Sequence, residues 1–297
     1  MIDNLTRNFT GPHAIEIRNL TKQYKDFRLE DLSFNVPDGF VCGFIGQNGA
    51  GKTTTLKLML NMVIKDAGEI RLFDRPETDA SVRDEIGVLL EQPFFQEDWN
   101  PAIVETVARS FYTRWDSTTY QRYLQRFGLD RQQKFKTLSR GMRMKLGLAI
   151  ALSHDARLLL LDEPTVGLDP VARDEFMDIL REYMTVEHRS IFFSTHMTDE
   201  LEKIADYVVY IHQGRLVYSG IKDELTERFC LIRGGEGELP PAKRAGIIGL
   251  REYAGGFEGM IAVADIGGFP SGVVTEMVSL SDIMIHMNKK EVKTDAL

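Results

Sequence analysis

The sequence has little cysteine, no long apolar run and no excess of basic residues. Only Cys42 and Cys230 occur in 297 residues. This count argues against a disulfide framework or a cysteine-based zinc site, and it favours a reducing, cytosolic environment. No segment approaches the roughly 20 apolar residues of a membrane-spanning helix. If the protein works at a membrane, we expect another chain to supply the spanning part.

The net charge and the first 13 residues argue against two further kinds of protein, one that binds nucleic acid and one that carries a signal peptide. The formal net charge of −8 offers no broad electrostatic surface for nucleic acid. Residues 1–13 contain Asp3 and lack an apolar core, so we expect a polar N-terminal arm rather than a signal peptide.

One glycine-rich segment separates an apolar strand pattern from a helical pattern. Residues 46–54 fit the P-loop spacing G-x-x-x-x-G-K-[ST]. Glycines let backbone N–H groups converge on an anion at a helix N-terminus, Lys52 can approach the β- and γ-phosphates, and Thr53 can offer its hydroxyl to Mg²⁺. The sequence therefore predicts binding of a nucleoside triphosphate. The residues expected to contact it are Gly46, Gln47, Asn48, Gly49, Ala50, Gly51, Lys52, Thr53 and Thr54.

Strand patterns alternate with helical patterns along most of the chain. Continuous apolar runs, such as residues 158–161 and 191–193, are typical of parallel strands covered on both faces. Alternating patterns at residues 14–20 and 28–36 indicate additional half-buried strands. Because ligands bind at the C-terminal ends of parallel strands, the residues at these ends are candidates for chemistry. They are Gly46, Gln92, Asp162 and His196.

Residues 94–153 change to helical spacing with many aromatics. Nine of the 28 aromatic residues lie between positions 94 and 127, which predicts an inserted helical subdomain. Most of these rings should fill a small core, while the remainder could form a surface groove for a partner.

The C-terminal segment carries no recognisable chemistry. We expect the nucleotide domain, residues 14–227, to end near Glu227, and residues 228–297 to form an accessory segment. Glycines and prolines at 234–241 indicate a linker or loop, and a final helix is expected over residues 281–288 with Ser281 as its N-cap.

Taken together, the motifs closely resemble the nucleotide-binding subunit of ABC transporters over residues 14–227. The matching positions, in chain order, are Tyr24 (aromatic loop), 46–54 (Walker A), Gln92 (Q-loop), 138–142 (signature), 158–163 (Walker B), 167–169 (D-loop) and His196 (switch histidine). The resemblance implies a P-loop NTPase fold of the ABC ATPase type. Such a fold is α/β, with a mostly parallel sheet, an antiparallel β part and an inserted helical subdomain.

Individual roles follow from chemistry and from this resemblance. Asp162, at a strand end, can hold Mg²⁺, and Glu163 is suited to polarise the attacking water as general base. The resemblance implies that Gln92 contacts Mg²⁺ or water, that His196 contacts the γ-phosphate and that Tyr24 stacks on adenine. The metal ligands expected are Thr53, Gln92 and Asp162.

The signature departs from the family's usual Leu-Ser-Gly-Gly-Gln. Arg140 replaces the first glycine and Met142 replaces the glutamine, while Ser139 and Gly141 are kept. In the family this element faces the ATP of the opposing subunit, so Ser139 and Gly141 are expected to bind nucleotide there. Similar variants occur in bacterial exporter ATPases whose membrane subunits are separate chains.

The resulting hypothesis is an ATPase subunit, using ATP and Mg²⁺, that powers export from the cytoplasmic side of the membrane. Its partners would be an integral membrane subunit and a second nucleotide-binding subunit, identical or not, with no nucleic acid. The transported compound stays open. The alternatives are a soluble ABC ATPase of translation or DNA repair, and a small-molecule P-loop kinase. The kinase would lack the signature and the switch histidine.

Overall fold

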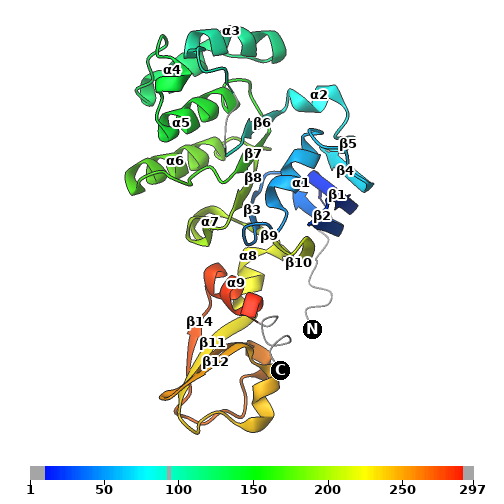
Figure 1. The fold of residues 1–297 in the computed structure, drawn as a ribbon, viewed down its shortest axis with the longest axis vertical. Coiled ribbons are helices and arrows are strands. Elements are labelled where there is room, and N and C mark those ends of the chain that lie inside the picture. The colour runs from blue at the N-terminus through cyan, green and yellow to red at the C-terminus, as the bar shows by residue number, and fades with distance from the viewer. Residues whose placement is uncertain (1–10, 92–94, 290–297) are drawn as a thin grey trace. The chain divides into compact units, whose positions relative to one another are not determined.

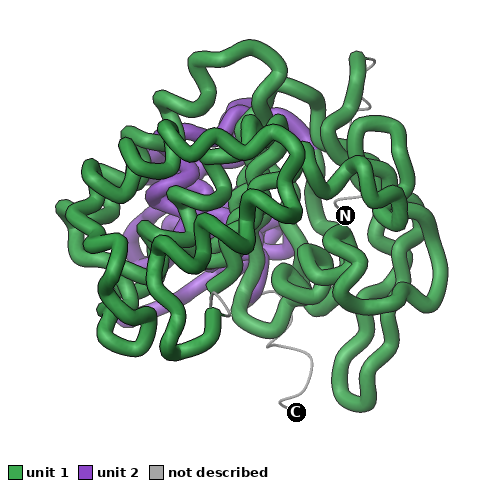
Figure 2. The backbone as a smooth tube through the Cα atoms, turned by 90° about the horizontal axis from the view of Figure 1, so that it is seen from above, with its two compact units in different colours: residues 1–196, 207–219 green, residues 197–206, 220–297 purple. Residues whose placement is uncertain are grey.

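The computed structural model describes residues 11–91 and 95–289, and its chain divides into two compact units (Figure 2). The first unit comprises residues 1–196 and 207–219, and the second comprises residues 197–206 and 220–297. The first ten residues of the expected N-terminal arm lie outside the described residues. The domain boundary expected near Glu227 stays a prediction.

A six-stranded sheet in the order β10-β9-β3-β8-β7-β6 forms the centre of the first unit (Figure 1). Its strands are β3 (Val41–Ile45), β6 (Ile86–Leu89), β7 (Leu158–Asp162), β8 (Ser190–Thr195), β9 (Tyr207–His212) and β10 (Arg215–Ile221). The neighbours β9-β3-β8-β7-β6 pair in parallel. Every residue of β3, β7 and β8 is buried, which is why these strands read as continuous apolar runs. The mostly parallel sheet expected from the sequence is confirmed, and it brings the C-terminal ends of β3, β7 and β8 to one edge.

An antiparallel sheet in the order β2-β1-β4-β5 forms a second layer of this unit. Its strands are β1 (His13–Gln23), β2 (Arg28–Pro37), β4 (Ala67–Leu72) and β5 (Arg75–Pro76). Helix α1 (Lys52–Met59) lies between the two sheets (Figure 1), and its buried Leu56 belongs to the core cluster that both sheets share. Phe34 of β2 stacks on Phe192 of β8 at a centroid distance of 6.1 Å. Burial of such side chains contributes about 1.5–3 kcal/mol each, so α1 is held firmly behind the P-loop.

The helical subdomain predicted between β6 and β7 is confirmed. Its main elements are α3 (Pro101–Phe111), α4 (Ser117–Arg126), the 3₁₀ turn η1 (Phe135–Thr137) and α5 (Arg140–Ala151). Helices α3 and α5 each begin after a residue whose side chain caps the helix N-terminus. The Asn100 side chain accepts a hydrogen bond from the Ile103 N–H ahead of Pro101, and the Ser139 hydroxyl accepts one from the Met142 N–H. The short α2 (Ala80–Arg83) precedes β6, and α6 (Pro170–Tyr183) follows β7.

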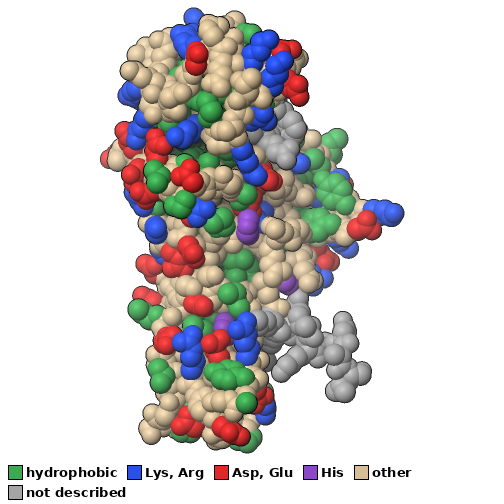
Figure 3. Space-filling model, turned by 60° about the vertical axis from the view of Figure 1, so that its left-hand side comes forward, with side chains coloured by type: hydrophobic (Ala, Val, Ile, Leu, Met, Phe, Trp, Pro, Cys, Tyr) green, Lys and Arg blue, Asp and Glu red, His purple; other side chains and the backbone are tan. Residues whose placement is uncertain are grey.

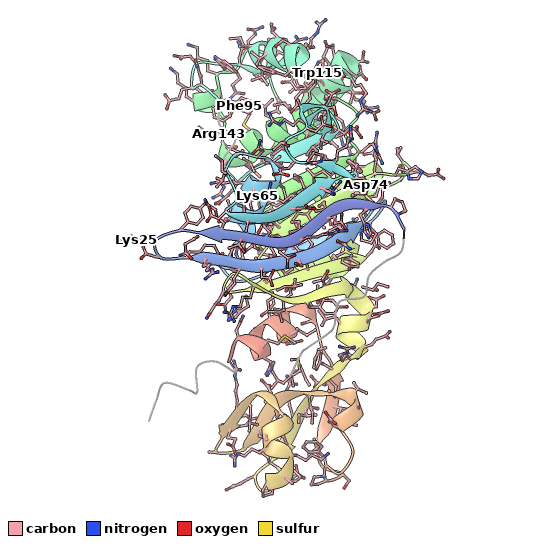
Figure 4. All side chains as sticks on the ribbon, turned by 90° about the vertical axis from the view of Figure 1, so that its right-hand side faces the viewer. Lys25, Lys65, Asp74, Phe95, Trp115 and Arg143 are labelled. Carbon is pink, nitrogen blue, oxygen red and sulfur yellow. The ribbon has the colours of Figure 1, made fainter. Side chains whose placement is uncertain are left out.

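The aromatic residues of this subdomain include both buried rings and exposed rings. Tyr120, Tyr123 and Phe127 are buried, and the Tyr120 hydroxyl donates to the Pro101 carbonyl at 3.0 Å. Phe95, labelled in Figure 4 on the helical subdomain, meets the Phe135 ring edge-on at 5.3 Å. Other rings line a groove that is described below.

The second unit contains a four-stranded antiparallel sheet in the order β12-β13-β11-β14. Its elements are α7 (Thr198–Ile204), α8 (Lys222–Glu227), β11 (Phe229–Gly235), η2 (Pro241–Gly246), β12 (Ile248–Tyr253), β13 (Gly256–Ala262), η3 (Val263–Asp265), β14 (Val274–Met277) and α9 (Leu280–Lys289). Its small core is built on Cys230, Ile232, Ile247, Phe257 and Ile261.

Two sequence interpretations in this unit were wrong. Gly234 and Gly235 end strand β11 rather than belonging to a linker, because Phe257 of β13 packs over Gly234 and leaves no room there for a side chain. Helix α9 begins at Leu280, and its cap is Ser279 rather than Ser281. The Ser279 hydroxyl accepts from the Asp282 N–H, while the Asp282 carboxylate accepts from the Ser279 N–H.

Truncation after Glu227 tests whether the nucleotide fold ends there. Within the second unit, α7 packs against α9 and the Glu202 carboxylate accepts a hydrogen bond from the Leu280 N–H. We expect the truncated protein to keep ATP binding, because no P-loop residue is removed, but to melt several degrees lower as α7 loses this support. Equilibrium ATP binding and thermal melting measure the two effects. An insoluble product, or one that does not bind ATP, would show that the segment completes the nucleotide fold.

Candidate functional site

The loop between β3 and α1 wraps around the Lys52 ammonium group. Lys52 Nζ donates to the Gly46 carbonyl at 2.8 Å and lies 3.3 Å from the Gln47 carbonyl, and only 6% of the residue is exposed. A Cβ on Gly46 would come within 2.5 Å of the Ile211 carbonyl oxygen, while Gly51, the N-cap of α1, has φ +112°. Both positions therefore require glycine. The exposed residues of the loop are Gln47, Asn48 and Gly49.

The Asp162 carboxylate, at the end of β7, connects this loop to the neighbouring strand β8. Its Oδ2 accepts from the Thr53 hydroxyl at 2.8 Å, and its Oδ1 accepts from the Ser194 hydroxyl at 3.0 Å. Asp162 is only 1% exposed. Burial, assisted by the nearby Glu163 carboxylate, raises its pKa above the usual range despite these two hydrogen bonds. A hydroxyl and a carboxylate that meet in this way form an oxygen-donor pair of the kind Mg²⁺ prefers.

Glu163 follows in a left-handed backbone conformation, with φ +48°. Its N–H donates to the Ser194 carbonyl at 2.9 Å, which extends the pairing of β7 with β8 by one residue. Its carboxylate lies 3.2 Å from Lys52 Nζ and 2.9 Å from His196 Nδ1. A left-handed residue other than glycine costs about 1–3 kcal/mol, and such strain is concentrated at functional sites. The structure thus brings Lys52, Thr53, Asp162, Glu163 and His196 together as one cluster.

The hairpin loop between β1 and β2 supplies the aromatic residue expected near the site. The Tyr24 N–H donates to the Phe27 carbonyl at 2.8 Å, and the side chain is 41% exposed. Lys25, beside it, lies at the tip of this hairpin (Figure 4). Phe27 packs on Gly51, where a Cβ would lie 2.9 Å from its ring. This contact places the loop beside the P-loop, although stacking of Tyr24 on adenine stays a prediction.

The signature residues Ser139 and Gly141 lie outside this cluster. Among the described residues, no hydrogen bond or ion pair joins Ser139 or Gly141 to residues 46–54; Gly141 instead lies against Leu168. Gln92 lies outside the described residues. Sequence reasoning missed Ser194 and Phe27. Ser194 directly follows the apolar pair Phe192-Phe193 at a strand end, and that position was a usable signal.

A groove of about 940 Å³ lies between the helical subdomain and the end of α1, within the first unit. Side chains on its two sides include Met59, Ile86, Leu89, Trp99, Val104, Val107, Phe111, Tyr112 and Ile150. Most of them are apolar, and Phe111 is 77% exposed. An exposed apolar groove of this size is typical of an interaction site.

Comparison with known proteins identifies the family. The family model described as ABC transporter matches residues 29–166, which include the P-loop and the β7 carboxylates. The bacitracin transport ATP-binding protein of Enterococcus faecalis is 33% identical over 221 residues, covering 73% of this chain and 72% of that protein. The chain belongs to the ABC transporter ATP-binding proteins.

Other comparisons agree with this membership. A lantibiotic transport ATP-binding protein of Streptococcus pyogenes is 34% identical over 222 residues, covering 72% of this chain and 95% of that protein. A solved ATP-binding subunit of an ABC transporter superposes with a TM-score of 0.65 at 26% identity, covering 71% of this chain and 91% of that one. These relatives favour the transport interpretation over translation, repair or a small-molecule kinase. The chain is thus an ABC ATP-binding subunit, and among its described residues no helix has the length and apolarity to span a membrane.

The raised pKa of Asp162 gives a test of the site through protein stability. Because this pKa is higher in the folded than in the unfolded state, the ionised carboxylate costs stability at neutral pH. The cost decreases as pH falls from the folded-state pKa towards the unfolded-state pKa, below which it is absent. We expect Asp162→Asn to stabilise the protein by about 0.5–2 kcal/mol near neutral pH without added nucleotide, and the gain should shrink on acidification.

Thermal melting at two pH values measures this gain. Asp178→Asn is the matched control, since Asp178 is exposed and pairs with Arg181 on the surface of α6. A lower melting temperature for Asp162→Asn at neutral pH would contradict the interpretation, because it would mean that the carboxylate's hydrogen bonds outweigh its burial.

Proposed function

We propose that this chain hydrolyses ATP and so powers export through a separate integral membrane subunit, to which it binds at the cytoplasmic face. The observation that carries hydrolysis is the position of the Glu163 carboxylate, between Lys52 and His196 and beside the P-loop. The relatives named for bacitracin and lantibiotic transport support the export role. The compound exported by this chain stays open.

Each residue of the cluster has its own proposed role in phosphoryl transfer. Lys52 and the N-terminus of α1 would bind the β- and γ-phosphates. Thr53 and Asp162 would hold Mg²⁺, with Gln92 as a further ligand expected from the sequence, and the metal would neutralise phosphate charge. Glu163 would accept a proton from the attacking water, and His196, 2.9 Å from Glu163, would contact the γ-phosphate.

The hydrolytic site is proposed to form between two nucleotide-binding subunits. Each chain has one P-loop and one signature, and Ser139 and Gly141 make their contacts away from the P-loop of their own chain. Pairing across a two-fold axis would bring the signature of one subunit to the ATP of the other. The second subunit can be an identical or a different chain.

The membrane subunit is proposed to insert an apolar segment into the groove beside α3. The groove is lined mainly by apolar side chains from two parts of the first unit. Nucleic acid is not expected as a partner. On the face shown in Figure 3, Lys and Arg side chains alternate with Asp and Glu rather than forming a continuous basic strip.

Glu163→Gln tests hydrolysis directly. Glutamine keeps the size of the side chain but cannot accept the proton, so we expect turnover to fall by roughly 10²–10⁴-fold while ATP binding is retained and ATP-bound dimers accumulate. Steady-state ATPase assays and size-exclusion chromatography with light scattering measure both effects. Glu182→Gln, which removes an exposed carboxylate paired with Arg126, is the control. Near-normal turnover in purified Glu163→Gln would rule out this base.

Phe111→Asp tests the groove. A charge at this exposed rim position should leave folding and ATP binding intact but weaken association with the membrane subunit about tenfold or more, since apolar anchors dominate such interfaces. Co-purification from membranes containing the coexpressed integral subunit is the measurement. Ile64→Asp is the control, because Ile64 is 80% exposed and does not line the groove. If Phe111→Asp and Ile64→Asp co-purified with the membrane subunit equally well, the groove would not be its binding site.

A further inference from the structure

Arg140, which stands where the family's signature has a glycine, connects two segments that follow core strands. Its Nη2 lies 3.3 Å from Oε1 of Glu91, shortly after the end of β6. Its side chain also passes over Gly167, in the turn that precedes α6. A Cβ on Gly167 would lie 3.2 Å from Arg140 Cδ and 3.3 Å from Nε. The glycine therefore provides the space that the arginine side chain occupies.

The charge of Arg140 is unfavourable where it stands unless it is compensated. Arg140 is the first residue of α5, and a cation at a helix N-terminus opposes the helix dipole. Glu91 supplies the compensating charge. The two side chains are 50% and 46% exposed, and pairs of this kind add little to the free energy of folding. We therefore expect removal of this pair to change the overall stability little.

Other contacts fix the same helix end from within the helical subdomain. Arg143, labelled in Figure 4, donates from Nε to the Leu138 carbonyl at 3.1 Å and lies over the Phe135 ring. These contacts tie the residue before Ser139 to its own subdomain. Arg140, through Glu91, is the ion-paired link from this helix end to the chain leaving the parallel sheet.

We propose that Arg140 is a positioning residue that holds Ser139 and Gly141 at a set place relative to the strand ends of the sheet. This inference rests on the proposed function, in which Ser139 and Gly141 meet the ATP of a second subunit. A helix end that is already oriented loses less conformational freedom when the two subunits close on ATP. Loss of the link should therefore weaken ATP-driven pairing without changing how one subunit binds ATP.

The test uses full-length Glu163→Gln protein and measures the ATP concentration that gives half-maximal dimer formation. Adding Arg140→Gln should raise this concentration roughly two- to fivefold, and Arg140→Lys should restore most of the loss because it keeps the charge. Glu91→Gln should have the same effect as Arg140→Gln, and the double substitution should add nothing further. Arg126→Gln, which breaks an equally exposed ion pair with Glu182, should cause no shift.

Glu91→Gln separates positioning from direct phosphate contact. If Arg140 acted by touching phosphate, the Glu91→Gln substitution would release the arginine side chain for that contact. Dimer formation would then need no more ATP than in the Glu163→Gln parent, and this result would overturn the proposal. If Arg140→Gln left the ATP concentration for half-maximal dimer formation unchanged, the proposal would also be overturned. The same holds if Arg140→Gln weakened ATP binding by single subunits to a matching extent, or lowered the melting temperature by several degrees. If the Glu163→Gln parent binds ATP but never dimerises, pairing of two identical chains is ruled out, and the role proposed for Arg140 in such a pair is ruled out with it.

Discussion

A single buried carboxylate, that of Asp162, organises the centre of this molecule. It accepts hydrogen bonds from Thr53 at the start of α1 and from Ser194 in β8, so three segments far apart in the sequence meet at one side chain. Burying this charge is unfavourable, as its raised pKa shows. The surrounding fold must offset this cost. The apolar strands β3, β7 and β8 do so through the favourable free energy of burial, because their side chains are removed from water on both faces. The apolar core thus maintains a carboxylate suited to a divalent cation.

The neighbouring carboxylate has a different environment although it is adjacent in sequence. At Glu163 the backbone turns into a left-handed conformation, and the side chain accepts contacts from Lys52 and His196 instead of from hydroxyls. Two consecutive acids therefore differ in their partners: hydroxyl groups surround one, and nitrogen donors surround the other. This division matches a metal ligand beside a base, and it is consistent with the opposite directions in which consecutive side chains leave a strand.

Much of this arrangement could be predicted from the sequence because it depends on local patterns. The P-loop spacing, the apolar strands and the acids after Leu161 fix which side chains reach the common edge of the sheet. Contacts between distant segments could not be predicted in the same way. Nothing in the local sequence indicates that Phe27 packs on Gly51 or that Arg140 pairs with Glu91, since both depend on how separate elements pack. The two glycines at the end of β11 were misassigned for the same reason, because their pairing with the distant residues Gly256 and Phe257 of β13 places them in a strand.

The pairing of β6 with β7 also places the groove close to the cluster that contains Asp162 and Glu163. Strand β6 contributes Ile86 and Leu89 to the groove, and Leu89 pairs directly with Leu161 of β7. Leu161 immediately precedes Asp162, so a segment seated in the groove would be one step of strand pairing from the buried carboxylate. Buried strands transmit displacement because close-packed interiors compress little. A partner that shifted β6 would therefore act on β7 or be resisted by it. If the proposed membrane subunit binds in the groove, this constraint would provide a physical route to the Glu163 carboxylate.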